Sequence, residues 1–216
     1  MYYPLVVIDN FFQDPDKIVE MANSHRFYPA SDFGGAWPGS RTKSLYEIEE
    51  SFYDYLTHRI TNIYYDTGGR EDSTFFQYDA RFQKIKPFSE SQYDKKNRGW
   101  IHKDTLSVFG GLIYLTKNPE PDTGTTMYRM KDGYNFCGME EEMEKRKLYS
   151  ALKSSEDYDF HFDKYHDQFE ESVKINSVYN RLIIFDAQIH HGVQTFGAKE
   201  RLTLPFFCHS ISSNAI

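Results

Sequence analysis

The chain changes its hydrophobic period near Thr74, and this change constrains its fold more than any other feature. Before it, apolar residues recur at three- and four-residue spacing over residues 45–66, which predicts an amphipathic helix. A shorter helix is expected over 15–24, because Asp14 can cap its first turn and Pro15 suits its first position. After Thr74, short aromatic and β-branched runs alternate with turn residues. The sequence therefore predicts a mostly β protein with flanking α-helices.

The predicted strands are short and regularly interrupted. They are expected over residues 5–9, 75–85, 106–116, 125–129, 181–185, 189–196 and 201–208. Within the third of these, Gly110-Gly111 is expected to break the strand. Many short strands after a helical segment are typical of a double-sheet sandwich or jelly roll.

The length of 216 residues and the mass of 25.5 kDa fit one well-filled core, so a single domain over 1–216 is expected. In it, residues 1–73 would form a helical N-terminal support and 74–216 the β core. The acidic, Tyr-rich stretch at about 130–178, helical around 139–153, interrupts that core as one long insertion. Long loops of this kind are often functional, and we expect a mobile cover over a binding pocket that determines substrate choice.

Charge and cysteine content exclude several classes of protein. The net charge is −7 and no segment concentrates Lys and Arg, so a nucleic-acid partner is not expected. Cys137 and Cys208 lack metal-ligand spacing, which indicates free thiols in a reducing compartment. The first residues show no secretory signal, and no apolar run has membrane-spanning length. We therefore expect a cytoplasmic protein with no membrane partner.

The candidate metal ligands begin with His102 and Asp104. Residues two apart on a strand project to the same face, so both side chains can reach one ion. With a distant histidine they form the ligand set of the facial triad that holds non-haem Fe(II) with open coordination positions. His190 and His191 are both candidates for that third ligand, but adjacent strand residues point to opposite faces. Either could instead be a structural histidine.

A second His-X-Asp pair, His161 and Asp163, competes with the first. It lies in the polar insertion, and no apolar strand follows it. A rigid strand is the better platform for two ligands, so the sequence favours His102 and Asp104 as the metal-binding pair.

Arg201 is the candidate for binding an acidic co-substrate. Its planar guanidinium can bind a carboxylate through two hydrogen bonds and stays charged when buried. An exposed strand charge is the alternative, but the apolar run over 202–207 favours an inward-facing side chain. Thr203 shares the face of Arg201, and Tyr114 on another predicted strand could add a second hydroxyl donor.

The order of these motifs resembles the Fe(II)/2-oxoglutarate-dependent oxygenases, in particular their prolyl-4-hydroxylase-like branch. The similarity also spans the opening strand and the turn after the distal histidine, and the spacing from Asp186 selects His191 over His190. The matching elements are His102/Asp104, Tyr114-Leu115, Gly124-Thr125-Thr126, Phe185-Asp186, His191-Gly192-Val193-Gln194 and Arg201-Leu202-Thr203.

This resemblance implies a double-stranded β-helix, or jelly-roll, core with Fe(II) between its sheets. His102, Asp104 and His191 would be the catalytic metal ligands. Arg201, Thr203 and Tyr114 would bind 2-oxoglutarate, the co-substrate that is consumed with O2. The implied activity is hydroxylation of an amino-acid side chain, either free or in a peptide.

Two other functions remain open from the sequence. One is a catalytically inactive jelly-roll binding or structural module, which would have no need for the full set of ligands. The other is an iron dioxygenase that does not use 2-oxoglutarate, for which Arg201 would have no role. Trp100 is expected in the core, and residues 37–41 could form a rim loop in which Arg41, or else Arg129, meets an acidic substrate group.

Overall fold

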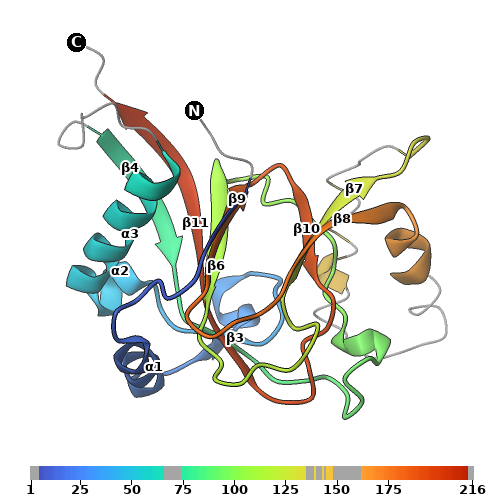
Figure 1. Ribbon diagram of the computed structural model, residues 1–216, viewed down its shortest axis with the longest axis horizontal. Helices are drawn as coiled ribbons and strands as arrows, with labels where there is room; N and C mark the ends of the chain where they lie inside the picture. Colours follow the sequence, from blue (N-terminus) through green and yellow to red (C-terminus); the bar gives the residue numbers. More distant parts are fainter. Residues whose placement is uncertain are drawn as a thin grey trace.

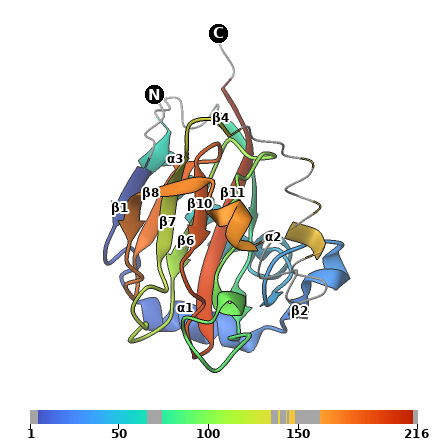
Figure 2. The same cartoon turned by 90° about the vertical axis from the view of Figure 1, so that its right-hand side faces the viewer.

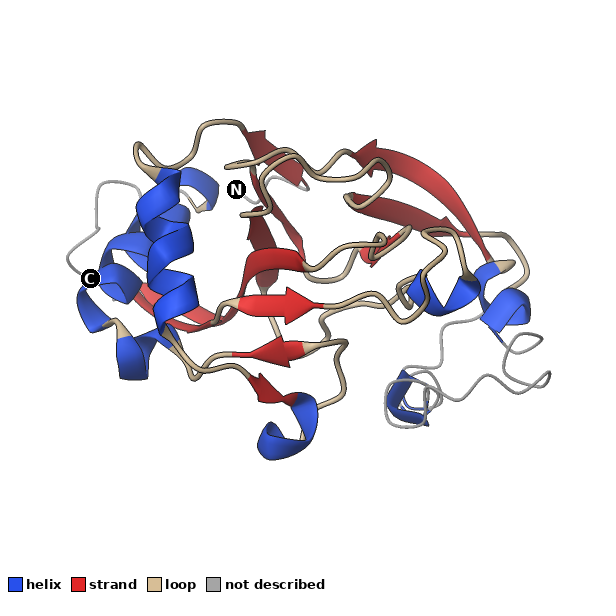
Figure 3. Cartoon of the chain, turned by 90° about the horizontal axis from the view of Figure 1, so that it is seen from below, coloured by secondary structure: helices blue, strands red, loops and turns tan. Residues whose placement is uncertain are grey.

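Two antiparallel β-sheets face each other in the computed structural model of the chain, and helices cover the outer face of the larger sheet (Figure 1). The structure describes residues 5–65, 74–134, 139, 143, 145–147 and 162–213. Viewed from below, the N-terminal helices gather at one end of the molecule, beside the strands of the larger sheet (Figure 3). This mostly β arrangement with a jelly-roll core confirms the predicted fold class.

The larger sheet has eight strands in the order β1-β9-β6-β11-β5-β3-β2, and β4 pairs with the far end of β11. Its long strand β11 lies beside β6 through the middle of the sheet (Figure 2). The bounds of these strands are β1 Leu5–Ile8, β2 Tyr28–Pro29, β3 Ser40–Arg41, β4 Thr74–Ala80, β5 Gln83–Ile85, β6 Phe109–Tyr114, β9 Leu182–Asp186 and β11 Arg201–Ser213.

The smaller sheet contains three strands in the order β10-β7-β8. They are β7 Thr125–Met130, β8 Phe169–Ile175 and β10 His190–Val193. The side chains of Met127 and Ile175 in this sheet join Tyr114, Ile183 and Phe185 of the larger sheet in one buried cluster. This cluster closes one end of the space between the two sheets.

The first helix begins where its capping residue predicts. Helix α1, Pro15–Ser24, has Asp14 as its N-cap, and the Asp14 carboxylate accepts a hydrogen bond from the Lys17 amide. The helix expected over 45–66 is instead two helices, α2 Leu45–Ile48 and α3 Glu50–Tyr64, which meet at Glu49. Among the described residues, the 3₁₀ helices Ala30–Phe33 and Lys95–Asn97 lie in the connections.

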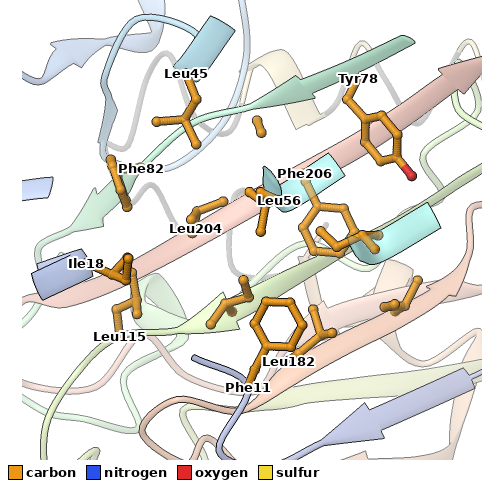
Figure 4. Close-up of a cluster of buried hydrophobic side chains, with 14 of the residues drawn as sticks. Phe11, Ile18, Leu45, Leu56, Tyr78, Phe82, Leu115, Leu182, Leu204 and Phe206 are labelled. Carbon is orange, nitrogen blue, oxygen red and sulfur yellow. The ribbon is translucent and has the colours of Figure 1, made fainter. Parts of the chain in front are cut away.

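The main hydrophobic core lies between the helices and the larger sheet (Figure 4). Leu204 and Phe206 of β11 project into it and are fully buried, as are Leu56 and Ile60 of α3. Because side chains alternate along a strand, the residues between them on β11 face the smaller sheet instead. Strand β11 therefore separates the apolar core from the space between the sheets.

Three sequence predictions about strands need correction. Residues 169–175 form β8, so the insertion predicted at about 130–178 is shorter than expected; β8 is mostly exposed and polar, which hid it. Gly110-Gly111 does not break its strand, because both residues pair within β6. The N-terminal region is not only helical, since β2 and β3 extend the larger sheet beside β5.

Other sequence predictions can be compared with the described residues. The described residues between 139 and 147 are helical, as expected. The remainder of the helix expected over 139–153 lies outside the described residues. Cys208 is a buried free thiol, and Cys137 lies outside the described part of the chain. No helix among the described residues is long and apolar enough to cross a membrane.

The two glycines of β6 should differ in how they tolerate a side chain. A Cβ at Gly111 would lie 2.1 Å from the Ile183 carbonyl oxygen, whereas at Gly110 its nearest contact is Asp104 at 3.3 Å. Gly111→Ala should therefore lower the free energy of unfolding by about 1–3 kcal/mol, and Gly110→Ala by less. Urea denaturation of both variants measures the difference, and equal losses would contradict the close approach at Gly111.

Candidate functional site

His102, Asp104 and His191 come together at the edge of the space between the sheets. His191 lies on β10, and His102 forms an isolated antiparallel bridge with it. Each of these two residues donates its backbone N–H to the carbonyl of the other, at 2.9 Å in both directions. The Asp104 N–H donates to the Ala187 carbonyl at 3.0 Å, so backbone hydrogen bonds fix all three positions.

The two imidazole rings are held in the same tautomer. His102 Nδ1 lies 2.9 Å from the Trp100 carbonyl oxygen, and His191 Nδ1 lies 2.9 Å from the Ile189 carbonyl oxygen. A carbonyl oxygen can only accept, so Nδ1 carries the proton in both rings. In a neutral ring this leaves Nε2 with a free lone pair, and such backbone contacts are the usual way in which metal-binding histidines are oriented.

The free donor atoms converge on one point. His102 Nε2 lies 3.6 Å from Asp104 Oδ1, and His191 Nε2 lies 3.5 Å from Asp104 Oδ2. One ligand atom from each residue lies within 4.8 Å of the other two, and the imidazole centroids are 4.5 Å apart. The distances between the imidazole and carboxylate atoms are longer than hydrogen bonds, which leaves room for an ion among them.

Electrostatics keep His102 available as a ligand. Burial, followed by the positive charge of Lys145, lowers the pKa of His102 well below its ordinary value. The ring is therefore neutral at physiological pH, the form in which imidazole binds a metal. Two imidazoles and one carboxylate fit the set that holds non-haem Fe(II) and leaves coordination positions open.

A cavity of about 200 Å³ extends from these three residues between the sheets. Its walls come from both sheets and from the loop before β3. Besides the three candidate ligands, the polar residues that line it are Trp37, Arg41, Gln83, Trp100, Thr125, Lys145, Arg201 and Thr203.

Arg201 and Thr203 lie on the face of β11 that lines this cavity. Arg201 is 6% exposed, and its Nε and Nη2 atoms have no hydrogen-bond partner among the described residues. Burial lowers the pKa of Arg201, and no carboxylate among the described residues forms an ion pair with it. A buried guanidinium with free donors is suited to an anionic ligand.

Tyr114 lies under Arg201 but has a different contact from the one expected. The Arg201 guanidinium carbon lies 5.6 Å from the centroid of the Tyr114 ring. The Tyr114 hydroxyl is 2.7 Å from Thr125 Oγ1 on the opposite sheet, and Tyr114 itself does not line the cavity. Tyr114 thus joins the two sheets behind Arg201, and its role in binding a co-substrate stays a prediction.

The other sequence candidates lie elsewhere. His190 faces away from His191, and its ring packs at 4.9 Å against Phe169. Burial, with Lys103 and His191, lowers the pKa of His190 to about 4. Asp163 forms an ion pair with Lys95 at 2.6 Å, and His161 lies outside the described residues. Arg129 is ion-paired with Glu170 on the surface, away from the cavity.

An aromatic cluster supports the extended segment before His102. The Tyr165 ring stacks on Trp100 at 3.9 Å with an interplanar angle of 5°, and the Tyr165 hydroxyl donates to the Ile101 carbonyl at 2.6 Å. Trp100 is buried, as expected, but it also lines the cavity, and its carbonyl accepts the His102 Nδ1 proton. The end of the insertion is therefore tied to the backbone that presents His102.

The sequence analysis missed several cavity residues. Gln83 and Lys145 line the cavity without belonging to any motif, and Thr125 belongs to the matching element Gly124-Thr125-Thr126 but was given no role in the site. Gln83 could have been suspected, because it is a polar residue between the apolar Phe82 and Ile85 on a strand. A second cavity of about 600 Å³ adjoins the first and is more open to solvent, so we call it the outer cavity and the first the inner cavity. The lining of the outer cavity includes Met139, Met143, Lys145 and Arg146 of the insertion. That the insertion covers the site stays a prediction.

Solved structures show which class of protein has this fold. HygX from Streptomyces hygroscopicus, with nickel and 2-oxoglutarate bound, matches with a TM-score of 0.55 and 10% identity over 94% of this chain and 82% of that one. A 2OG-Fe(II) oxygenase family oxidoreductase from Burkholderia pseudomallei matches with a TM-score of 0.51 and 11% identity over 95% and 84%. A prolyl hydroxylase from Trichoplax adhaerens matches with a TM-score of 0.51 and 10% identity over 95% of this chain and 83% of that one. The fold is therefore that of the Fe(II)/2-oxoglutarate oxygenases, including prolyl hydroxylases, as the sequence resemblance implied.

The sequence itself places the chain more narrowly. The profile of a family of unknown function, DUF6445, matches residues 2–201, and the chain belongs to this family. No curated protein matches the sequence. This member of the family has the fold of these oxygenases, and its activity has to be inferred from its site.

Replacement of the two neighbouring histidines should have different effects on metal affinity. We expect His191→Ala to abolish binding of Fe(II), because it removes one of three convergent donors. His190→Ala should leave binding within about twofold of the wild type, because its ring faces Phe169. Anaerobic titration calorimetry measures both affinities, and equal losses from the two changes would show that the distal ligand is assigned wrongly.

A buried histidine in the aromatic cluster should make stability depend on pH. His166 stacks on Phe162 at 4.1 Å, and burial, with the charge of Arg98, lowers its pKa to about 3. Below about pH 6.5 the unfolded chain binds a proton that the folded chain does not, so stability falls by up to about 1.4 kcal/mol per pH unit. Urea denaturation between about pH 7 and pH 5 should show a shallower fall for His166→Phe than for the wild type. Identical slopes would mean that His166 is not buried as a neutral ring.

Proposed function

We propose that this protein is a non-haem Fe(II)- and 2-oxoglutarate-dependent dioxygenase that hydroxylates an amino-acid side chain, either free or in a peptide. One observation carries the proposal. The His102–Asp104–His191 cluster and the guanidinium of Arg201, whose buried nitrogens lack partners, face the same cavity. A metal ligand set and an anion-binding group in one cavity are what a chelating dicarboxylate requires.

Each residue then has a defined task. His102, Asp104 and His191 would hold Fe(II) and leave three positions for other ligands. Bound Fe(II) and 2-oxoglutarate would together activate O2 for attack on a C–H bond. The protein contributes orientation: the backbone carbonyls of Trp100 and Ile189 fix the rings, and the two buried faces of the sheets limit access of water.

Arg201 and Thr203 would bind the far carboxylate of 2-oxoglutarate. Both line the cavity from one face of β11, and the Arg201 nitrogens without partners can donate two parallel hydrogen bonds. Tyr114 would stabilise the Arg201 charge through its ring, while its hydroxyl is held by Thr125.

The structural relatives support this activity without defining the substrate. HygX binds nickel and 2-oxoglutarate, which supports the same co-substrate here. The Trichoplax prolyl hydroxylase was solved with a peptide fragment, and HygX also with hygromycin B, so the fold accepts both peptides and small molecules. An iron dioxygenase without 2-oxoglutarate would leave the Arg201 charge buried and unused, which favours the 2-oxoglutarate-dependent function.

Arg201→Lys should weaken binding of 2-oxoglutarate roughly tenfold or more, because lysine keeps the charge but loses the two-pronged geometry. The measurement is the visible absorption band that forms when 2-oxoglutarate chelates Fe(II), titrated anaerobically. Binding of Fe(II) itself should stay close to the wild-type value, because Arg201 does not belong to the metal cluster.

Arg129→Lys serves as the matched control, since Arg129 is a surface residue paired with Glu170. It should leave both affinities unchanged. Unaltered affinity for 2-oxoglutarate in Arg201→Lys would remove Arg201 from the site. A wild-type protein that binds Fe(II) but forms no absorption band would contradict the use of 2-oxoglutarate, and a band without succinate release in air would indicate an inactive module.

A further inference from the structure

A second arginine, the half-buried Arg41 of β3, lines the same cavity. The strand register pairs Arg41 of β3 with Gln83 of β5, and Gln83 in turn with Thr203 of β11. Directly paired residues point to the same face of a sheet. Arg41, Gln83 and Thr203 therefore form a polar row across the cavity wall.

The Arg41 guanidinium is held in place by aromatic rings rather than by acids. Its carbon lies 4.3 Å from the Trp37 ring centroid and 5.6 Å from that of Phe207. One of its nitrogens donates to Gln83 Oε1 at 3.3 Å, and Gln83 is itself anchored by its donation to the Pro38 carbonyl at 2.7 Å. This arrangement fixes the orientation of the cation, and the nearby carboxylates of Asp79 and Asp104 act on it only at longer range, without an ion pair among the described residues.

Other arginines of the chain are paired with carboxylates, as is usual for an arginine with a structural role. Arg81 donates from Nε to both carboxylate oxygens of Asp79, at 2.8 and 2.9 Å. Arg181 contacts both carboxylate oxygens of Asp9, at 2.6 and 2.9 Å. Arg41 has no such partner: among the described residues no carboxylate forms an ion pair with it, and its buried Nε atom has no acceptor. Arg41 shares this property with Arg201.

The charges around the cavity leave room for one more anion. Among the described residues that line it, Arg41, Lys145 and Arg201 are cationic, and Asp104 is the one carboxylate. The charges of Fe(II) and of 2-oxoglutarate would cancel each other, so the excess of positive charge would remain after both had bound. Burial lowers the pKa of Arg41 to about 10, which still leaves it protonated at neutral pH.

Arg41 also stands where the inner cavity meets the outer one. It lines both, together with Trp37 and Phe207, whereas Arg201 lines only the inner one of the two. His102 and Asp104 likewise line both cavities. A molecule that approaches the candidate metal ligands from the outer cavity would therefore pass Arg41 and not Arg201.

We propose that Arg41, backed by Trp37 and Gln83, binds a carboxylate of the primary substrate, so that this enzyme acts on a carboxylate-bearing compound. The inference rests on the proposed function, because it assigns Arg201 to 2-oxoglutarate and Arg41 to the second ligand. The Arg41 guanidinium packs over the Trp37 ring, and its own planar set of N–H donors favours a planar anion such as a carboxylate.

The test uses the full chain labelled with ¹⁵N-arginine, loaded with Zn(II) in place of iron and saturated with 2-oxoglutarate. The probes are N-acetyl-L-alanine and its neutral isostere N-acetyl-L-alaninamide. The acid should shift the Arg41 Nε–H resonance and bind roughly tenfold or more tightly than the amide, because a charged hydrogen bond is lost with the amide. Arg41→Gln should bind the two probes equally, and Arg41→Lys should keep part of the preference.

Arg59→Gln is the control for loss of a stacked arginine, since Arg59 lies over the Phe11 ring at 4.2 Å on α3 and does not line the cavity. It should retain the full preference for the acid. Equal binding of acid and amide to the wild type, a preference that survives in Arg41→Gln, or a shift confined to the Arg201 resonance would each overturn the proposal. If Arg41→Gln does not fold, the shift of the Arg41 Nε–H resonance in the wild-type protein, titrated with the acid and with the amide, decides whether Arg41 binds the carboxylate.

The two proposals can fail separately in the same samples. Addition of 2-oxoglutarate should shift the Arg201 Nε–H resonance before any probe is present. If Arg201 does not respond, the proposed function fails, while the acid and amide titration of the protein without 2-oxoglutarate still decides the role of Arg41.

Discussion

The alternation of side chains along β11 is the constraint on which the rest of the structure depends. Leu204 and Phe206 face the helices, whereas Arg201, Thr203 and Phe207 face the space between the sheets. The strand pairs with β6, β5 and β4, so its register is fixed from both sides. A slip of one residue would turn the arginine into the hydrophobic core and two apolar side chains into the cavity. Burial of the core therefore determines where the cavity has its charge.

The positions of the candidate metal ligands depend on a smaller backbone constraint. The bridge between His102 and His191 is a single pair with two reciprocal backbone hydrogen bonds, at the mouth of the sandwich. Each ring is then oriented by a carbonyl two residues earlier in its own segment. Because both contacts involve the backbone, the geometry requires little from other side chains. The arrangement of the three candidate ligands therefore follows mainly from the path of the backbone.

The sequence predicted those parts of the site that local strand parity controls. The two-residue spacing of His102 and Asp104 and the opposite faces of His190 and His191 follow from the pleat of a strand. The shared face of Arg201 and Thr203 follows from the same alternation. Five of the six predicted site residues line one cavity, and the sixth, Tyr114, does not. The α1 boundary was also predictable, because Asp14 and Pro15 are local signals.

The sequence predictions that were wrong concern elements whose structure depends on contacts between residues far apart in the chain. Strands β2 and β3 have two residues each, too few for any periodicity, and exist because they pair with each other and with β5. Strand β8 is mostly exposed, so its sequence reads as a polar loop. Gly110-Gly111 suggested a break, but the missing side chain at Gly111 lets the Ile183 carbonyl approach. Gln83 and Arg41 face the cavity only because these same pairings place them there.

The two unpaired arginines also bear on stability. Burial of a charge without a counter-charge is costly, and the lowered pKa values of Arg41 and Arg201 both have burial as their largest cause. Elsewhere the chain avoids this cost by pairing, as Arg181 does with Asp9. A carboxylate introduced beside either cavity arginine would relieve the cost within the fold, but it would also occupy the donors that a ligand needs. The positions where the protein leaves charge uncompensated are therefore the positions where an anionic ligand gains most, and this links the stability of the folded chain to occupation of its site.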